Sequence, residues 1–382
     1  RSVPVEDMNH RDPSAEPSHR LVILGGGFAG VWAAIAAAET AAALGPVEID
    51  LVSPGERFVP RPRLYERDPE ATTVPLAEIL EPRGVNHVRA RVTSIDPDAS
   101  AVTTIDEHGT EATLDYDRLI LATGSHVVAP PIDATHLHDI DTLAAAKALD
   151  ERLASLGDGS TIVVVGAGFV GVELACELPA RAPGSRVVLL ERADTVAPEM
   201  GPHPRPVIAA ALDDLGVDVR TGASIVSFDG ERVEMADGST FPADVVVWTA
   251  GIRASPLTGA LSADLDALGR LRVDQCQRVV GVPGVFAAGD TAAPLDESGH
   301  TVAQSAQHAM PQGTCAGHNA VAELAGAPLS ELSTLPYGVC LDLGAAGAVF
   351  TQGWEREVAL VGDDAKSIKR DITGTWLYPP AV

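Results

Sequence analysis

The chain contains the same strand–turn–helix pattern twice. Residues 21–24 are a short apolar strand before the glycine-rich turn of residues 25–30, and residues 162–165 precede a second such turn at residues 166–171. Both turns have the spacing GxGxxG and are followed by a stretch typical of a helix. One glycine of such a turn allows a tight bend, one lets a pyrophosphate approach the backbone, and one packs the helix on the strand. The repeat therefore predicts two Rossmann-type dinucleotide-binding units.

Each unit has a second hydrophobic strand that ends in small residues. These are residues 119–124 (Leu-Ile-Leu-Ala-Thr-Gly) and residues 245–251 (Val-Val-Val-Trp-Thr-Ala-Gly). Small residues are expected where the chain and a dinucleotide come close. The residues predicted to contact dinucleotides are Gly25, Gly27, Phe28, Ala29 and Gly30 in the first turn, Ala122, Thr123 and Gly124 after its partner strand, Gly166, Gly168, Phe169, Val170 and Gly171 in the second turn, and Gly251.

An acidic residue follows the second turn at the distance that ribose binding requires. Glu191 ends a strand twenty residues after Gly171. A carboxylate there can accept hydrogen bonds from both hydroxyls of an adenosine ribose, and it repels a 2′-phosphate. Glu191 therefore favours NADH over NADPH. The neighbouring Arg192 leaves some NADPH use open, and an ordinary surface charge is the alternative interpretation of Glu191.

The corresponding strand of the first unit ends without an acid. Residues 49–52 are followed by Ser53 and Pro54, which are the candidate contacts there, and Ser53 can supply one hydrogen bond. Glu48 and Asp50 alternate with core residues on this strand. We interpret them as edge charges rather than ribose ligands.

A third group of candidates lies nearer the C-terminus. Residues 285–288 are a buried strand that stops at Gly289 and Asp290, and a carboxylate there can bind a polyol chain. The next segment, residues 306–313, leads into a predicted helix, and Pro311 fits its first position, where no N–H is needed. Free N–H groups of that turn could stabilise negative charge on a reduced flavin ring.

Taken together, these segments resemble flavoproteins with two dinucleotide-binding domains, above all type II NADH dehydrogenases and apoptosis-inducing-factor-like oxidoreductases. The resemblance extends over about residues 20–325. The matching segments are the two glycine-rich turns, residues 62–66 (Pro-Arg-Leu-Tyr-Glu), 122–124, 248–251, 289–290 and 306–309 (Ala-Gln-His-Ala). The fold that this implies is α/β, with two Rossmann-type domains of the glutathione-reductase-like FAD/NAD(P)-binding kind and a small C-terminal α+β cap.

The resemblance also implies cofactors and residue roles. The first unit would hold FAD and the second NADH, Asp290 would bind the ribityl chain, and Val92 would contact adenine through its backbone. Glu173 resembles the family's acid near the nicotinamide, with a helix-surface carboxylate as the alternative. Hydride would pass from NADH to FAD, and a second substrate would then take the electrons. The other residues that the resemblance makes candidates are Arg61 and Ala309 for cofactor binding and Gln307 for catalysis.

Three departures from the family pattern concern the electron acceptor. The four cysteines, Cys176, Cys276, Cys315 and Cys340, form no CxxC pair, so disulfide reduction is disfavoured. Quinone-reducing members have two adjacent glutamines where this chain has Pro311 and Gln312. The C-terminus also has no recognisable amphipathic helix of the kind that lies on lipid. We expect a small-molecule acceptor, no stable membrane anchor and no metal.

The pattern divides the chain into four parts. Residues 1–19 are expected to be a disordered tail, because they are polar and lack the apolar core of a signal peptide. Residues 20–140 and 270–330 would form a split FAD-binding domain, and residues 141–269 an NADH-binding domain. Residues 331–382 would be a cap or interface domain, with a homodimer as one option and Trp354, Trp376 and Tyr378 as core, interface or acceptor-site aromatics. The uncharged run of residues 21–38 is as long as a membrane span, but its three glycines predict strand, turn and helix instead.

Charge narrows the function further. The chain has 27 Lys and Arg against 53 Asp and Glu, a net charge of -26, which repels nucleic acid. It also argues against docking of an acidic electron-transfer protein. The leading interpretation is a cytoplasmic FAD enzyme that oxidises NADH and reduces a quinone-like or other small acceptor. The alternatives are a slow redox-sensing NADH/FAD protein and a reductase of a small electron-transfer protein.

Overall fold

Two parallel five-stranded sheets organise the chain. The computed structural model describes residues 19–334 and 336–381. The first sheet has the strand order β20-β9-β1-β2-β5 and the second the order β11-β18-β12-β13-β14. The strands of the first are β1 (His19–Leu24), β2 (Val47–Val52), β5 (Asn86–Val88), β9 (Arg118–Leu121) and β20 (Val285–Ala287), and those of the second are β11 (Leu137–His138), β12 (Thr161–Val165), β13 (Arg186–Leu190), β14 (Asp218–Arg220) and β18 (Val245–Trp248).

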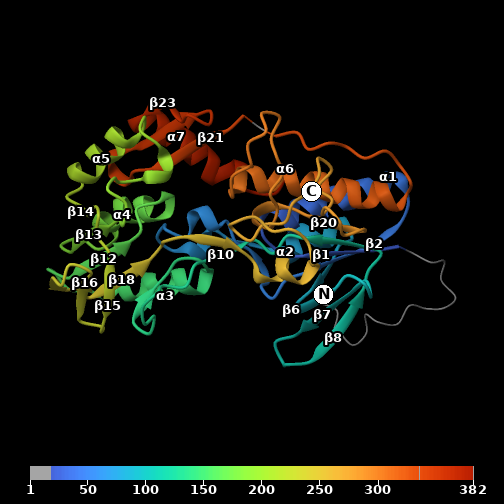
Figure 1. Cartoon of the computed structure of the whole chain (residues 1–382), viewed down its shortest axis with the longest axis horizontal. Helices are drawn as coiled ribbons and strands as arrows, with labels where there is room; N and C mark the ends of the chain where they lie inside the picture. The colour runs from blue at the N-terminus through green and yellow to red at the C-terminus, as the bar shows by residue number, and fades with distance from the viewer. Residues whose placement is uncertain (1–18, 335, 382) are drawn as a thin grey trace.

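Helices cover these sheets, and the C-terminal segment lies across the second unit. Figure 1 shows the second sheet with α3, α4 and α5 at the left, α1 and α6 at the right, and the C-terminal elements at the top. The helices are α1 (Phe28–Leu44), α2 (Leu76–Leu80), α3 (Leu143–Ala154), α4 (Phe169–Arg181), α5 (Arg205–Asp214), α6 (Ala306–Leu324) and α7 (Gly362–Asp371).

Short antiparallel sheets fill the remaining positions. β10 (Ser125–Val127) pairs with β19 (Ile252–Ala254), where the chain passes between the two units. The others are β3 (Arg57–Phe58) with β4 (Val74–Pro75), β6 (Arg91–Asp96) with β7 (Ala101–Ile105) and β8 (Glu111–Asp115), β15 (Ile225–Phe228) with β16 (Arg232–Met235) and β17 (Thr240–Pro242), and β21 (Gly338–Asp342) with β22 (Ala348–Gln352) and β23 (Glu357–Val361).

The glycine-rich turns have the conformation that the repeat predicts. α1 and α4 each begin one residue after the second glycine of their turn, at Phe28 and Phe169. A Cβ atom on Gly30 would lie 1.8 Å from the carbonyl oxygen of Gly25, and one on Gly171 equally close to that of Gly166. Only glycine therefore lets each helix pack on its strand. The membrane-length run of residues 21–38 forms β1, the turn and part of α1, as expected.

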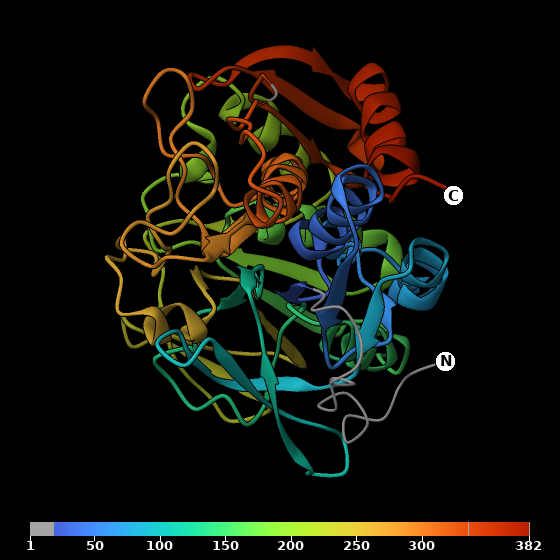
Figure 2. The same cartoon turned by 90° about the vertical axis from the view of Figure 1, so that its right-hand side faces the viewer.

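Helix α6 packs closely along α1, and Figure 2 shows the two side by side. Cβ atoms on Gly313 and Gly317 would lie 2.2 and 2.1 Å from the carbonyl oxygens of Ala29 and Ala33. The prediction that Pro311 opens this helix is wrong, because α6 begins at Ala306 and contains Pro311 in its second turn. Because proline has no N–H, it cannot bond to the carbonyl of Gln307.

The prediction for Asp50 is also wrong. β2 lies between β1 and β5, so Asp50 is fully buried rather than an edge charge. Arg20 Nε donates to its carboxylate over 2.6 Å, and Asn86 Nδ2 over 2.9 Å. The buried charge is thus paired and hydrogen-bonded, as burial requires.

The remaining predictions fall partly outside the described residues. Of the predicted tail, residues 1–19, only His19 is described, and it begins β1. In the described part of the chain, no helix is both long and apolar enough to cross a bilayer.

Candidate functional site

The first turn, its neighbouring strand ends and Asp290 come together at one edge of the first sheet. The Ser53 side chain lies beside Gly26, because a Cβ atom on that glycine would be 2.8 Å from Ser53 Oγ. Gly289 packs on Ala29 and Ala309. Pro54 follows Ser53 into an exposed loop, and Val92 lies in β6 beside a β-bulge.

This edge fits a bound dinucleotide. A Cβ atom on Gly27 would meet no atom of the described chain within 4 Å, so the turn is open on that side. The hydroxyl oxygen of Thr123 is buried and has no hydrogen-bond partner among the described residues. Buried polar groups are normally paired, and Thr123 Cα would lie only 3.2 Å from a Cβ on Gly25. An open turn beside an unpaired donor is what a phosphate-bearing ligand needs.

Asp290 lies in a polar cluster with Arg61. Ser125 Oγ donates to Asp290 Oδ2 over 2.6 Å, and Arg61 Nη1 lies 3.8 Å from the same oxygen. Arg61 Nη1 also donates to Ser125 Oγ over 3.1 Å, and Arg61 pairs with Asp141. Ser125 directly follows Gly124, so the cluster adjoins the small residues that end β9. A polyol chain could take over the hydrogen bond that Ser125 now makes to Asp290.

The second turn is joined to its acidic residue. Glu191 Oε2 accepts a hydrogen bond from the N–H of Ala167 over 2.7 Å, and Oε1 accepts one from that of Ala193 over 2.8 Å. The carboxylate therefore lies directly at the glycine-rich turn. Val170 is exposed and Phe169 half-buried at the start of α4. Gly251 has a φ of 75° and leads into β19.

Glu173 is buried beneath the C-terminal segment and is not on a helix surface. Lys369 Nζ of α7 donates to Glu173 Oε1 over 2.7 Å, and the N–H of Asp342 donates to the same oxygen over 3.0 Å. Tyr65 donates its hydroxyl to Asp342, which also pairs with Lys366. Burial raises the pKa of Glu173, and its charge contacts with Lys369 oppose that rise. The cluster joins the first unit, α4 and the C-terminal segment.

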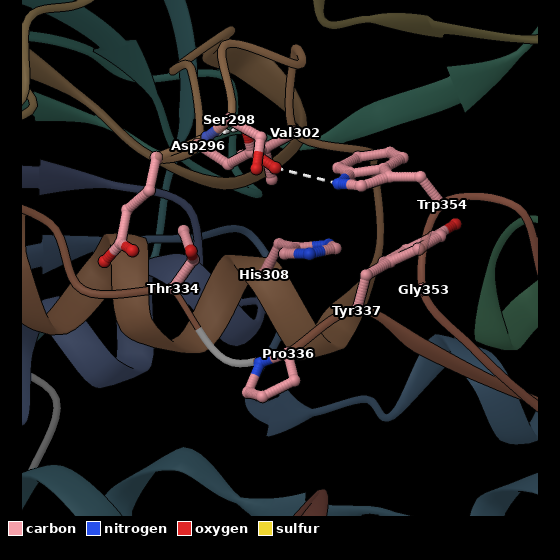
Figure 3. Close-up of a pocket in the computed structure, with 10 residues that line it drawn as sticks. Asp296, Ser298, Val302, His308, Thr334, Pro336, Tyr337, Gly353 and Trp354 are labelled. Carbon is pink, nitrogen blue, oxygen red and sulfur yellow. Dashed lines mark hydrogen bonds between the residues drawn. The ribbon is translucent and has the colours of Figure 1, made fainter.

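A cavity of about 260 Å³ opens beside the N-terminal end of α6 (Figure 3). The His308 and Tyr337 rings stack with their centroids 5.4 Å apart, and Tyr337 stacks on Trp354 at 4.4 Å. His300 continues this stack at 4.8 Å from Trp354, whose Nε1 donates to Asp296 over 2.8 Å. The cavity thus has an aromatic wall, and its lining also includes the polar residues Asp296, Glu297, Ser298 and Thr334.

The glutamines of α6 have different surroundings. Gln307 Nε2 donates to the carbonyl oxygen of Pro336 over 2.9 Å, at the edge of this cavity. Gln312 is buried and accepts a hydrogen bond from the N–H of Gly289 over 2.8 Å. Gln312 therefore holds the strand end before Asp290 in position and does not face the cavity.

Sequence reasoning missed Lys369, Asp342 and the ring stack of His308 with Tyr337. Nothing in the local sequence marks Lys369, which is 196 residues from Glu173. The ring stack had one signal in the sequence: His308 lies in the family-like segment 306–309, and Trp354 is one of the aromatic residues of the predicted cap. Of the other aromatics, Trp376 is exposed, whereas Tyr378 bonds to Arg63 and to the carbonyl oxygen of Thr72.

Comparison with known proteins identifies the family. The profile described as pyridine nucleotide-disulphide oxidoreductase matches residues 19–313. The chain belongs to this family. Among similar proteins, an NADH dehydrogenase-like protein of Mycobacterium tuberculosis is 44% identical, and the alignment covers 94% of this chain and 94% of that protein. A demethylphylloquinone reductase of Synechocystis is 31% identical, covering 87% of this chain and 86% of its own. The structure of NDH2 from Plasmodium falciparum with NADH aligns at a TM-score of 0.78 with 14% identity, covering 95% of both chains.

Membership of the pyridine nucleotide-disulphide oxidoreductases confirms several predictions. The resemblance to NADH dehydrogenases, the α/β fold with two dinucleotide-binding units, and FAD and NADH as cofactors are all borne out. The protein is an NADH-dependent flavin oxidoreductase. The roles of individual site residues stay predictions.

The cysteines of this oxidoreductase are unsuited to disulphide chemistry. Each cysteine of the described chain is free. Burial raises the pKa of Cys315 to about 12 and that of Cys340 to about 11, and it also raises the pKa of Cys176 and Cys276. Thiol–disulfide exchange requires a thiolate, so these thiols are poor nucleophiles at neutral pH.

Replacement of Asp290 by alanine should lower the FAD content of the purified protein. The variant removes the carboxylate that faces Ser125, while Arg61 keeps its contacts with Ser125 and Asp141. The fold should therefore persist, with little change in melting temperature. The ratio of flavin to protein absorbance measures the effect, with the exposed Asp264→Ala as control. Full FAD retention would contradict the predicted role of Asp290.

Replacement of Glu191 by alanine should raise the KM for NADH by about tenfold or more and leave kcat nearly unchanged. A charged hydrogen bond to the ribose contributes about 1.5–3 kcal/mol to substrate and transition state alike. Steady-state rates measure both constants, and Asp194→Ala, on the same exposed loop, is the control. An unchanged KM would show that Glu191 does not bind the ribose.

Proposed function

We propose that this protein oxidises NADH and delivers the electrons to a small, planar, quinone-like acceptor. The observation that carries the proposal is the aromatic cavity at the end of α6, on the same helix whose Gln312 supports the Gly289–Asp290 strand end. Cavities that bind small planar molecules are mostly apolar with a few polar groups. The 31% identity to a demethylphylloquinone reductase gives independent support for a quinone.

Different parts of this chain would hold the different reactants. The first turn, Thr123 and Asp290 would hold FAD, and the second turn and Glu191 would hold NADH. FAD, when bound, accepts hydride from NADH and passes electrons to the acceptor. Glu173 would orient the nicotinamide, because Lys369 and the Asp342 N–H fix its carboxylate at one oxygen. Positional catalysis of this kind needs no side-chain nucleophile.

His308, which ends the stack of rings in the cavity wall, would bind the acceptor by stacking, with Tyr337 beside it. Burial lowers the pKa of His308, so the imidazole is neutral at pH 7 and adds no charge to the apolar wall. Gln307, whose side chain bonds to Pro336 at the cavity edge, would contribute a polar contact to a carbonyl group of the acceptor.

An anaerobic absorption spectrum tests the proposal. The yellow protein should bleach with one equivalent of NADH and recover its colour rapidly with the soluble quinone menadione. Slow recovery with a persistent long-wavelength band would instead favour a redox-sensing protein. A protein that can neither be isolated with FAD nor reconstituted with it would overturn the proposal.

The net charge of -26 and the pairing of the lysines argue against an acidic electron-transfer protein as the acceptor. Such partners are commonly acidic and dock on basic surfaces. Of the three lysines, Lys369 is buried on Glu173 and Lys366 pairs with Asp342. The side chain of Lys147 is the most exposed of the three, and it pairs with Glu70.

A further inference from the structure

Glu199 lies against the glycine-rich turn of the second unit. It belongs to a short 3₁₀ turn, Pro198–Met200. A Cβ atom on Gly168 would lie 3.3 Å from Glu199 Oε2 and 3.6 Å from Oε1. Gly168 is the second glycine of the turn, where the pyrophosphate of a dinucleotide approaches the backbone. The carboxylate therefore stands on the side of the turn where a diphosphate would arrive.

Arg356 reaches the same turn from the C-terminal segment. It lies between β22 and β23, and its guanidinium is 5.2 Å from the ring centroids of Phe169 and Tyr337. Its Nη1 is 3.8 Å from the sulfur of Met200, the residue after Glu199. Phe169 directly follows Gly168, so one cation and one anion border the site of the diphosphate.

The two charges influence one another. Burial raises the pKa of the Glu199 carboxyl and the charge of Arg356 lowers it, whereas Glu191 raises it further. The Glu199 residue is exposed to solvent, although the atoms around its carboxyl group partly desolvate that group, so a ligand can reach it. The backbone around both groups is strained, since Ala197 has a φ of 47° and Arg356 one of 56°. Such left-handed conformations are costly for residues other than glycine and are concentrated at functional sites.

We propose that Glu199 and Arg356 are opposed positioning residues for the diphosphate of the nicotinamide dinucleotide. The Glu199 carboxylate repels the negatively charged diphosphate at its binding position. Arg356 attracts the diphosphate and so connects the C-terminal segment to the bound dinucleotide. The inference rests on the proposed use of the second unit for NADH.

Titration calorimetry of the FAD-loaded protein with ADP-ribose tests this inference without any redox step. Glu199→Gln should tighten ADP-ribose binding by about tenfold, because a like charge near the diphosphate is removed. Arg356→Met should weaken it by about tenfold, and Arg356→Lys should restore most of the affinity. The matched controls are Glu355→Gln, an exposed carboxylate of the same turn, and Arg370→Met, an exposed arginine of α7. Both controls should bind like the wild type.

A second ligand separates a direct role from a structural one. Adenosine has no phosphate, so its inhibition constant against NADH should be the same in the wild type, Glu199→Gln and Arg356→Met. Equal losses for adenosine and ADP-ribose would overturn the inference, as would unchanged ADP-ribose affinity in either variant. In those cases reduction of the wild type by NADH would leave the proposed function intact. A wild type that neither binds ADP-ribose nor is reduced by NADH would overturn both.

Discussion

Gly30→Ala should strongly destabilise the first unit, whereas Gly27→Ala should fold normally and lose FAD. The added methyl of Gly30→Ala would lie 1.8 Å from the carbonyl oxygen of Gly25, so α1 or its strand must move. Displacement of a packed backbone belongs to the most damaging class of substitution, which costs about 4–5 kcal/mol. Urea unfolding of the variant measures this cost.

Gly27→Ala tests ligand binding alone. Gly27 has a φ of -87°, which alanine adopts freely, and its Cβ would lie in open space. That space is where we predict the pyrophosphate of FAD, so the methyl should expel the cofactor without changing the free energy of unfolding of the apoprotein. Gly55→Ala, at another open loop position, is the control for both variants. Full FAD content in Gly27→Ala would contradict the predicted cofactor contact.

Lys369→Met should destabilise the protein by about 3–5 kcal/mol, because it leaves the buried carboxylate of Glu173 without its cation. The ion pair is 2.7 Å long, and both side chains are below one-tenth exposed. Denaturant unfolding of the folded protein measures the loss. The exposed pair of Lys147 with Glu70 is the matched control, since solvent screens that pair and Lys147→Met should barely change the free energy of unfolding.

The double variant Glu173→Leu/Lys369→Met distinguishes an unpaired charge from lost packing. Removal of both charges should recover much of the stability, because the desolvation penalty disappears with the carboxylate. A double variant that is no more stable than Lys369→Met would show that the methylene packing of the lysine, and not its charge, stabilises the cluster.

The parts of the fold with a local signature could be predicted from sequence. The spacing of Gly25, Gly27 and Gly30, repeated in the second unit, predicts a strand, a tight turn and a helix, and the structure has that arrangement. The α+β character predicted for the C-terminal segment also agrees with its strands β21 to β23 and its helix α7. These elements depend on residues that are neighbours in sequence.

Features made by distant segments could not be predicted. The sequence does not reveal that Asp50 is covered, because β5, which lies beside it, has only three residues and no strong pattern. Pro311 was assigned to a helix start because proline is most common there, whereas the packing of Gly313 and Gly317 on α1 keeps the helix continuous around it. The surroundings of Glu173 depend on α7, which no local pattern connects to α4.

The protonation state of the four thiols bears on how well the protein resists oxidation. Flavin chemistry in the presence of dioxygen can generate peroxide, and peroxide oxidises cysteine through its thiolate. Burial keeps all four thiols protonated at neutral pH, with Cys315 and Cys340 titrating only at about 12 and about 11. A protein built in this way should survive many rounds of electron transfer in air without oxidative damage to its cysteines.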